Sequence, residues 1–176
     1  MNWLGLSRPV SARVLPLVAI LSLFAAPSGA VDRVHVANPE GPTELAFTQP
    51  NGRAVRATVS QAKLTNNYPY TVALLWGGDE GELPHIVLTS IQIRDGDDAM
   101  VIPLSAYSDL GDVTGVSIGP TAKGFSLRIH GGRTATSYDV VLTFEHGWLV
   151  TRTVALREFP DQRLETTRYK FPKRPS

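Results

Sequence analysis

The architecture follows from three stretches, GFSLRIH (residues 124–130), SYDVVLTFE (137–145) and WLVTRTVAL (148–156). In the first two, apolar side chains recur at every second position, which is the period of a β-strand. His146-Gly147, between the second and third stretches, predicts a tight turn. We therefore predict three consecutive strands in an antiparallel meander. One face of the first two strands should point into the core: Phe125, Leu127, Ile129, Tyr138, Val140, Leu142 and Phe144.

Similar but less regular patterns lie upstream and downstream of the meander. They predict strands near 33–37, 44–48, 53–64, 70–76, 85–93, 99–104, 114–118 and 165–171. Breaks are expected at residues 51–52, 67–69, 77–78, 95–96 and 119–120, where Gly, Pro and Asn gather. No segment after the first thirty residues shows a clean helical period, and residues 104–110 have room for one short helix at most. We predict a single all-β domain, an antiparallel β-sandwich, with a small β-barrel as the alternative.

Residues 1–30 have the pattern of a secretory signal peptide. Arg8 and Arg13 supply positive charge, residues 14–26 are apolar apart from Pro16 and Ser22, and small residues end the segment at Ala30. An uncleaved anchor is the alternative, but a spanning helix needs about 20 apolar residues. We expect cleavage after Ala30, a periplasmic or secreted protein, and no membrane span in the remaining chain.

The expected mature chain is a β-rich domain over residues 31–169, followed by a basic, Pro-rich tail at 170–176 that should fray. Losing the two leader arginines would change the net charge from +1 to −1. Such a balance gives no electrostatic basis for binding nucleic acid. The sequence has no cysteine, which excludes disulfides, thiolate metal sites and cysteine nucleophiles.

The segment Asp95-Gly96-Asp97-Asp98 is the best candidate for a metal site. Its three carboxylates, Asp95, Asp97 and Asp98, could supply oxygen ligands to Ca²⁺ in a weak site. Asp-Gly is also a favoured pair in hairpin turns, and the glutamate that ends an EF-hand loop is missing. We favour a plain turn, with weak Ca²⁺ binding as the alternative and no other cofactor expected.

Aromatic and acidic residues gather between positions 68 and 82. Aromatic side chains beside charges are typical of recognition surfaces, although Trp76 also suits the buried end of a strand. The glycines among these residues predict a segment that projects from the domain. The candidate partner-binding residues are Tyr68, Tyr70, Trp76, Asp79, Glu80 and Glu82.

Catalytic sequence motifs are absent or incomplete in this chain. Ser60-Gln-Ala-Lys63 matches a Ser-x-x-Lys pattern, but its partner motifs are missing, so enzymatic activity is left open, with the balance against it. The histidines at 35, 85, 130 and 146 are scattered, although two strands could bring His130 and His146 within reach of each other. We expect an exported binding protein whose partner is another envelope protein, as for an inhibitor, an immunity factor or an accessory factor. The alternatives are a polysaccharide-binding module and a small envelope hydrolase that uses paired carboxylates.

Overall fold

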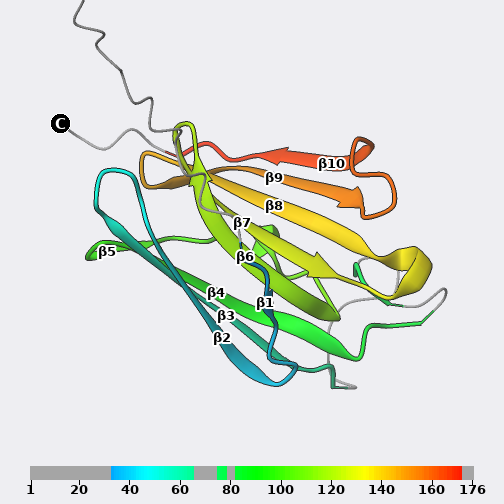
Figure 1. Ribbon diagram of the computed structural model, residues 1–176. Helices are drawn as coiled ribbons and strands as arrows, with labels where there is room; N and C mark the ends of the chain where they lie inside the picture. Colours follow the sequence, from blue (N-terminus) through cyan, green and yellow to red (C-terminus); the bar gives the residue numbers. More distant parts are fainter. Residues whose placement is uncertain (1–32, 66–74, 79–81, 172–176) are drawn as a thin grey trace, which may run out of the picture.

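The computed structural model describes residues 33–65, 75–78 and 82–171, and their strands form two antiparallel sheets (Figure 1). The six-stranded sheet has the strand order β1-β6-β7-β8-β9-β10 and the four-stranded sheet the order β2-β3-β4-β5. The strands of the first sheet are β1 (His35–Val36), β6 (Val113–Thr121), β7 (Gly124–Gly131), β8 (Tyr138–Glu145), β9 (Trp148–Leu156) and β10 (Arg163–Arg168). Those of the second are β2 (Gly41–Thr48), β3 (Ala54–Lys63), β4 (Ile86–Asp95) and β5 (Asp98–Met100).

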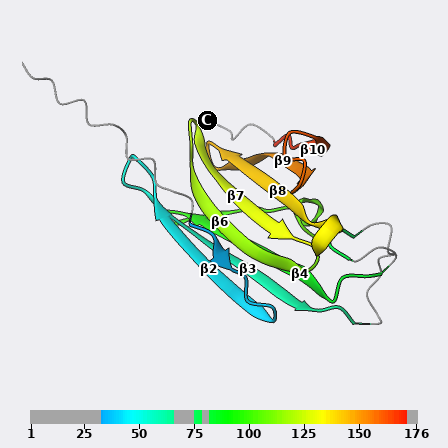
Figure 2. The same ribbon diagram turned by 45° about the vertical axis from the view of Figure 1, so that its right-hand side comes forward.

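The two sheets pack face to face, and Figure 2 shows them as separate layers. The predicted sandwich is therefore confirmed, and the sheets do not close into the barrel that was its alternative. Each sheet is a meander of strands that follow one another in the chain, except for β1, which leaves sequence order to pair with β6. Every second hairpin turn of a meander lies at the same end, so the turns gather at the two ends of the sandwich.

The predicted β7–β8–β9 meander is confirmed. Phe125 pairs with Phe144, Leu127 with Leu142 and Ile129 with Val140. All seven side chains assigned to the core face are buried, and they pack against apolar residues of the four-stranded sheet. Residues of that sheet in the core are Leu45, Val55, Ala57, Val59, Leu88, Ile91 and Ile93.

The turn predicted at 146–147 is confirmed, and the one predicted at 95–96 is present one residue later, at Gly96 and Asp97. Gly96 follows β4 with a φ of +61°, in the two-residue loop that leads into β5. His146 and Gly147 both have positive φ, +51° and +82°, as a type I′ turn requires. Both loops join their strands as two-residue hairpins.

Some predicted boundaries were wrong. Residues 99–104 do not form one strand, because β5 ends at Met100 and Leu104–Ala106 form a 3₁₀ turn. The break expected at 119–120 is absent, since β6 continues through Pro120 to Thr121. Proline is tolerated there because β1 pairs only with Gly115 and Val116, which leaves that side of Pro120 without a neighbouring strand.

Two other boundaries also differ. The last strand covers Arg163–Arg168 rather than 165–171, and a second 3₁₀ turn, not predicted, covers Thr134–Thr136. Phe171, inside the predicted tail, stacks on Trp148 with ring centroids 4.6 Å apart. Most of the strand predicted at 70–76 lies outside the described residues, but Trp76 forms a single parallel bridge with Leu110. Among the described residues, no helix has the length and apolar character needed to cross a bilayer.

Candidate functional site

Four hairpin turns, two from each sheet, meet at one end of the sandwich, the left-hand end in Figure 1. They enclose a cavity of about 280 Å³, which we call the turn-end pocket. Its main lining side chains are Gln49, Asn51, Arg53, Asp95, Asp98, Lys123, Phe125, Phe144 and His146. Such a loop cluster on a rigid β-scaffold is the usual position of a binding site in sandwich domains.

One wall of the pocket is an ion-pair network from the four-stranded sheet. The Arg53 guanidinium lies 2.8 Å from Asp95 through Nε and 2.6 Å from Asp98 through Nη2. Gln49 Nε2 donates to the same Asp95 oxygen at 2.8 Å. The Asp95 side chain is only 14% exposed, whereas that of Asp98 is 65% exposed. This wall is therefore polar and fixed in position, with one carboxylate open to a ligand.

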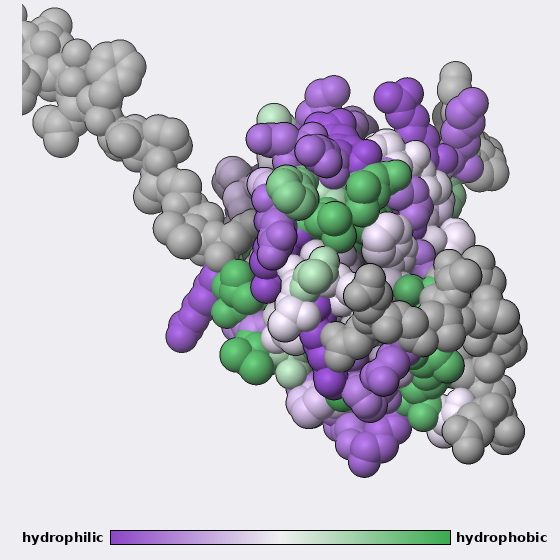
Figure 3. Space-filling model, turned by 90° about the vertical axis from the view of Figure 1, so that its right-hand side faces the viewer, coloured by the Kyte–Doolittle hydropathy of each residue, from purple (hydrophilic) through white to green (hydrophobic). Residues whose placement is uncertain are grey.

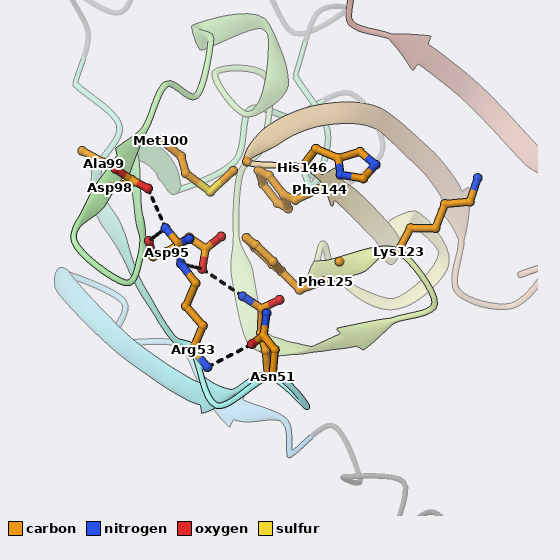
Figure 4. Close-up of a pocket in the computed structure, with 13 residues that line it drawn as sticks. Asn51, Arg53, Asp95, Asp98, Ala99, Met100, Lys123, Phe125, Phe144 and His146 are labelled. Atoms are coloured by element: carbon orange, nitrogen blue, oxygen red, sulfur yellow. Dashed lines mark hydrogen bonds and ion pairs between the residues drawn. The ribbon is translucent and has the colours of Figure 1, made fainter. Parts of the chain in front are cut away.

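The opposite wall carries two exposed basic side chains, Lys123 and His146, from turns of the six-stranded sheet. Figure 4 shows both on the far side of the phenylalanine rings from Arg53, Asp95 and Asp98. A side chain at positive φ is strained, and the first position of a type I′ turn favours asparagine. His146 adopts this conformation at a φ of +51°, and histidine, like asparagine, is among the non-glycine residues that adopt positive φ more often than most.

The floor of the pocket is aromatic and rigid. Phe125 and Phe144 stack with ring centroids 4.7 Å apart and planes inclined by 14°. Phe47, from the other sheet, contacts Phe125 with a centroid distance of 6.0 Å. Both stacked rings are buried, so their role is to support the polar walls rather than to present a face to a ligand.

The predicted turn at Asp95–Asp98 lies beside this pocket, and an arginine pairs with two of its three carboxylates. Arg53 takes the position that a cation would take between Asp95 and Asp98. The described residues contain no group of three or more metal-ligating side chains. The geometry thus favours the plain turn, stabilised by Arg53.

Trp76 and Glu82, the two described members of the aromatic and acidic cluster, lie toward the opposite end of the sandwich. The Trp76 ring packs on Tyr138 at a centroid distance of 6.2 Å. Its backbone N–H donates to the Asp109 carbonyl at 2.7 Å, and its backbone carbonyl accepts from the Gly111 N–H at 2.9 Å. Trp76 is therefore part of the packed structure, as its strand-like position suggested. Gly77 is also buried, with no room for a Cβ beside the Gly111 carbonyl, so it serves close packing rather than projection.

Glu82, the other described member of this cluster, is exposed. The remaining members, Tyr68, Tyr70, Asp79 and Glu80, lie outside the described residues, and their role in partner binding stays a prediction.

Figure 3 views this end of the molecule. On the coloured surface, apolar residues form separate small patches among hydrophilic ones, in contrast to the broad apolar area of a permanent interface.

The histidines are not brought together. His130 lies near the end of β7, opposite Asp139, while His146 is in the turn at the other end of β8. His130 Nδ1 lies 2.7 Å from Asp139 Oδ1, and Arg157 Nε shares that oxygen at 3.3 Å. His85 interacts with Arg133 through Nδ1 at 2.7 Å.

The structure contains a buried cluster of charged side chains that the sequence patterns did not predict. Arg152, on β9, has a side chain only 2% exposed and donates to the carboxylates of Asp109 and Glu165. Burial raises the pKa of the Asp109 carboxyl, and the Arg152 charge partly opposes this shift. A single guanidinium lies between the two carboxylates, in the space that a hydrolase keeps for water and substrate.

Comparisons of the sequence with protein-family models and with curated proteins, and of the fold with solved structures, found no match. Any functional conclusion therefore depends on the geometry of this chain alone.

Proposed function

We propose that the protein is an exported, non-catalytic binding protein that recognises a protein partner with the turn-end pocket. The observation that carries the proposal is the convergence of four hairpin turns on one cavity with polar walls and a rigid floor. A volume of about 280 Å³ accommodates one large side chain from a partner. The export part of the proposal is supported by the signal-peptide pattern of residues 1–30.

The charges in the pocket define the kind of group that it would accept. Asp98 offers an exposed carboxylate on one wall, while Lys123 and His146 offer exposed donors on the other. A partner loop with both an acceptor and a donor group satisfies both walls at once. Because these groups are at the pocket rim, they contribute to partner choice and association rate more than to raw affinity.

The hydrolase alternative receives less support from the geometry. Two carboxylate pairs among the described residues, Asp95 with Asp98 and Asp109 with Glu165, are each bridged by an arginine. A catalytic pair needs one carboxyl free to give up a proton and the other free to act on substrate or water. The bridging guanidinium groups favour a structural role for both pairs.

The proposal is tested by capture of envelope proteins on the immobilised exported chain. We expect the wild type to retain a defined partner and Lys123→Glu to lose most of it, because the substitution reverses a charge at the pocket rim. Arg56→Glu makes a similar charge change on an exposed position of β3, on the other sheet, and serves as the matched control. Equal capture by wild type and Lys123→Glu would contradict the turn-end pocket as the binding site.

A further inference from the structure

The outer face of the six-stranded sheet forms a second concave surface, with a cavity of about 470 Å³. Its floor lies on β8 and β9 and consists of short side chains. Thr143 pairs with Thr151 across the two strands, and Val141 pairs with Thr153. Ala155 continues the floor toward the end of β9. Three of these five side chains carry a hydroxyl group beside a methyl group.

Arginines form both walls of this surface. Arg128, on β7, pairs with Val141 at one side of the floor. On the other side, β10 places Arg168 opposite Thr151 and Arg163 opposite Ala155. All three arginines are exposed and line the same cavity, which we call the Arg–Thr groove.

A bulge in β10 brings Arg163 and Arg168 to the same face. The two residues are an odd number of positions apart, so a regular strand would point them to opposite faces. The register shifts between Arg163 and Glu165, which inserts Leu164 as an extra residue. The bulge therefore places both guanidinium groups on the outer face, over the groove, while Glu165 still pairs with Arg152 on the inner face of the sheet.

The groove is cationic although the chain as a whole is nearly neutral. Its only acidic lining residue among those described is Asp139, which already interacts with His130 and Arg157. Within the described part of the chain, Arg163 and Arg168 take part in no ion pair. As far as the described residues go, two guanidinium groups on the β10 wall thus face solvent without a carboxylate partner.

The arrangement of the arginines fits an extended anionic chain. Along the strands, Arg163, Arg128 and Arg168 fall on successive cross-strand rows that are about 7 Å apart, and they alternate between the two walls. A polymer lying along β8 and β9 would therefore meet a positive charge at each row. The threonine hydroxyls between the walls both donate and accept hydrogen bonds, as sugar hydroxyls require.

We propose that the Arg–Thr groove binds an acidic polysaccharide along β8 and β9. Its carboxylates pair with the arginines, its hydroxyls bond to the threonines, and its C–H faces pack on Val141, Ala155 and the threonine methyls. An acidic peptide fits less well, because the backbone groups of β8 and β9 are already paired within the sheet and its face offers none to which an extended peptide could add as a strand. The groove is separate from the turn-end pocket, so the two proposals can fail independently.

Calorimetric titration of the exported protein at low ionic strength tests the proposal. The probe is an oligogalacturonate long enough to span the three rows, with a neutral cello-oligosaccharide and a poly-glutamate of equal charge as comparisons. We expect the oligogalacturonate to bind with a Kd below about 1 mM, more tightly than either comparison and less tightly as salt is raised. Absence of such binding, or tighter binding of poly-glutamate, would overturn the proposal.

The double variant Arg163→Gln with Arg168→Gln should weaken oligogalacturonate binding about tenfold. Replacing both arginines with lysine should retain more of the affinity than glutamine does, because the charge remains. Arg56→Gln with Arg94→Gln removes an equal charge from a cross-strand arginine pair on the other sheet, and we expect it to leave binding unchanged. An equal loss in both glutamine variants would show nonspecific attraction and would contradict a site at the groove.

Discussion

Arg152 and Asp109 form an ion pair at 2.6 Å, with the Arg152 side chain only 2% exposed. The guanidinium also donates to Glu165, so it links β9 and β10 to the connection that follows the 104–106 turn. Thr167 donates to the same Glu165 oxygen at 2.9 Å. Removing one member of such a cluster leaves a buried charge with fewer ion-pair partners.

Asp109→Ala should therefore lower the free energy of unfolding by about 3 kcal/mol, measured by urea denaturation. Replacing the whole cluster with apolar residues, Arg152→Met with Asp109→Leu and Glu165→Leu, should cost less than this single change, because no buried charge remains. Asp97→Ala, in an exposed turn, is the control and should change stability by less than about 0.5 kcal/mol. A similarly small effect of Asp109→Ala would contradict the structural role of the cluster.

Tyr138 should control stability in alkali. Burial raises its pKa far above the ordinary value, and its hydroxyl donates to the Gly111 carbonyl at 2.8 Å. The unfolded chain loses this proton above about pH 10 and the folded chain does not, so the free energy of unfolding should fall by up to about 1.4 kcal/mol per pH unit there. Tyr138→Phe should flatten this alkaline decline, at a cost of about 1 kcal/mol at neutral pH. If the free energy of unfolding of Tyr138→Phe fell with pH as steeply as that of the wild type, Tyr138 would not be the group responsible.

The two faces of β8 should respond differently to truncation. Leu142 is buried between the sheets, so Leu142→Ala should cost about 2–5 kcal/mol. Thr143, the next residue, lies on the outer face, and Thr143→Ala should cost little. Chemical denaturation of both variants checks the prediction, which equal losses would refute.

His146 should be a position where stability and binding conflict. His146→Asn suits the positive φ of +51° and should raise the free energy of unfolding by about 0.5 kcal/mol. The same substitution should weaken capture of the partner by the turn-end pocket. Gly147→Ala, at a φ of +82°, provides the opposite case and should destabilise the turn by about 1 kcal/mol. Improved stability with unchanged capture would remove His146 from the binding site.

The exported protein should begin at Val31, because small residues precede the expected cleavage point. The intact mass of protein recovered from the periplasm or medium measures this directly. Recovery of the uncleaved chain from the membrane fraction would contradict the export proposal.

The sequence predicted the elements whose side chains alternate strictly. β7 and β8 have one apolar face and one face that is polar except for Val141, so the period alone located their core residues from Phe125 to Phe144. The two-residue turns at Gly96 and His146 could also be predicted from the sequence, since their positive φ angles favour particular residues, glycine above all. These are local signals, readable from a few neighbouring positions.

The charged cluster and the groove depend on bulges, which a period of two cannot reveal. In β9, the register shift beside Phe144 brings Leu149 and Arg152 to the same buried side, although their spacing is odd. The shift in β10 likewise sets Arg163 beside Arg168. The turn-end pocket joins residues as distant as Arg53 and His146, and only the topology of both sheets brings them together.

The sequential order of strands in each sheet has a consequence for folding kinetics. Nearly every strand pairs with its neighbour in the chain, and apart from the long 64–85 connection between β3 and β4 the loops that join paired strands are short. The protein should therefore fold quickly for an all-β domain. The β1–β6 pair is the exception, because the whole four-stranded sheet lies between its two strands in sequence. The loop closure for this pair is the most costly, so β1 should dock after the transition state has passed. Substitutions in β1 would then accelerate unfolding while leaving the folding rate nearly unchanged.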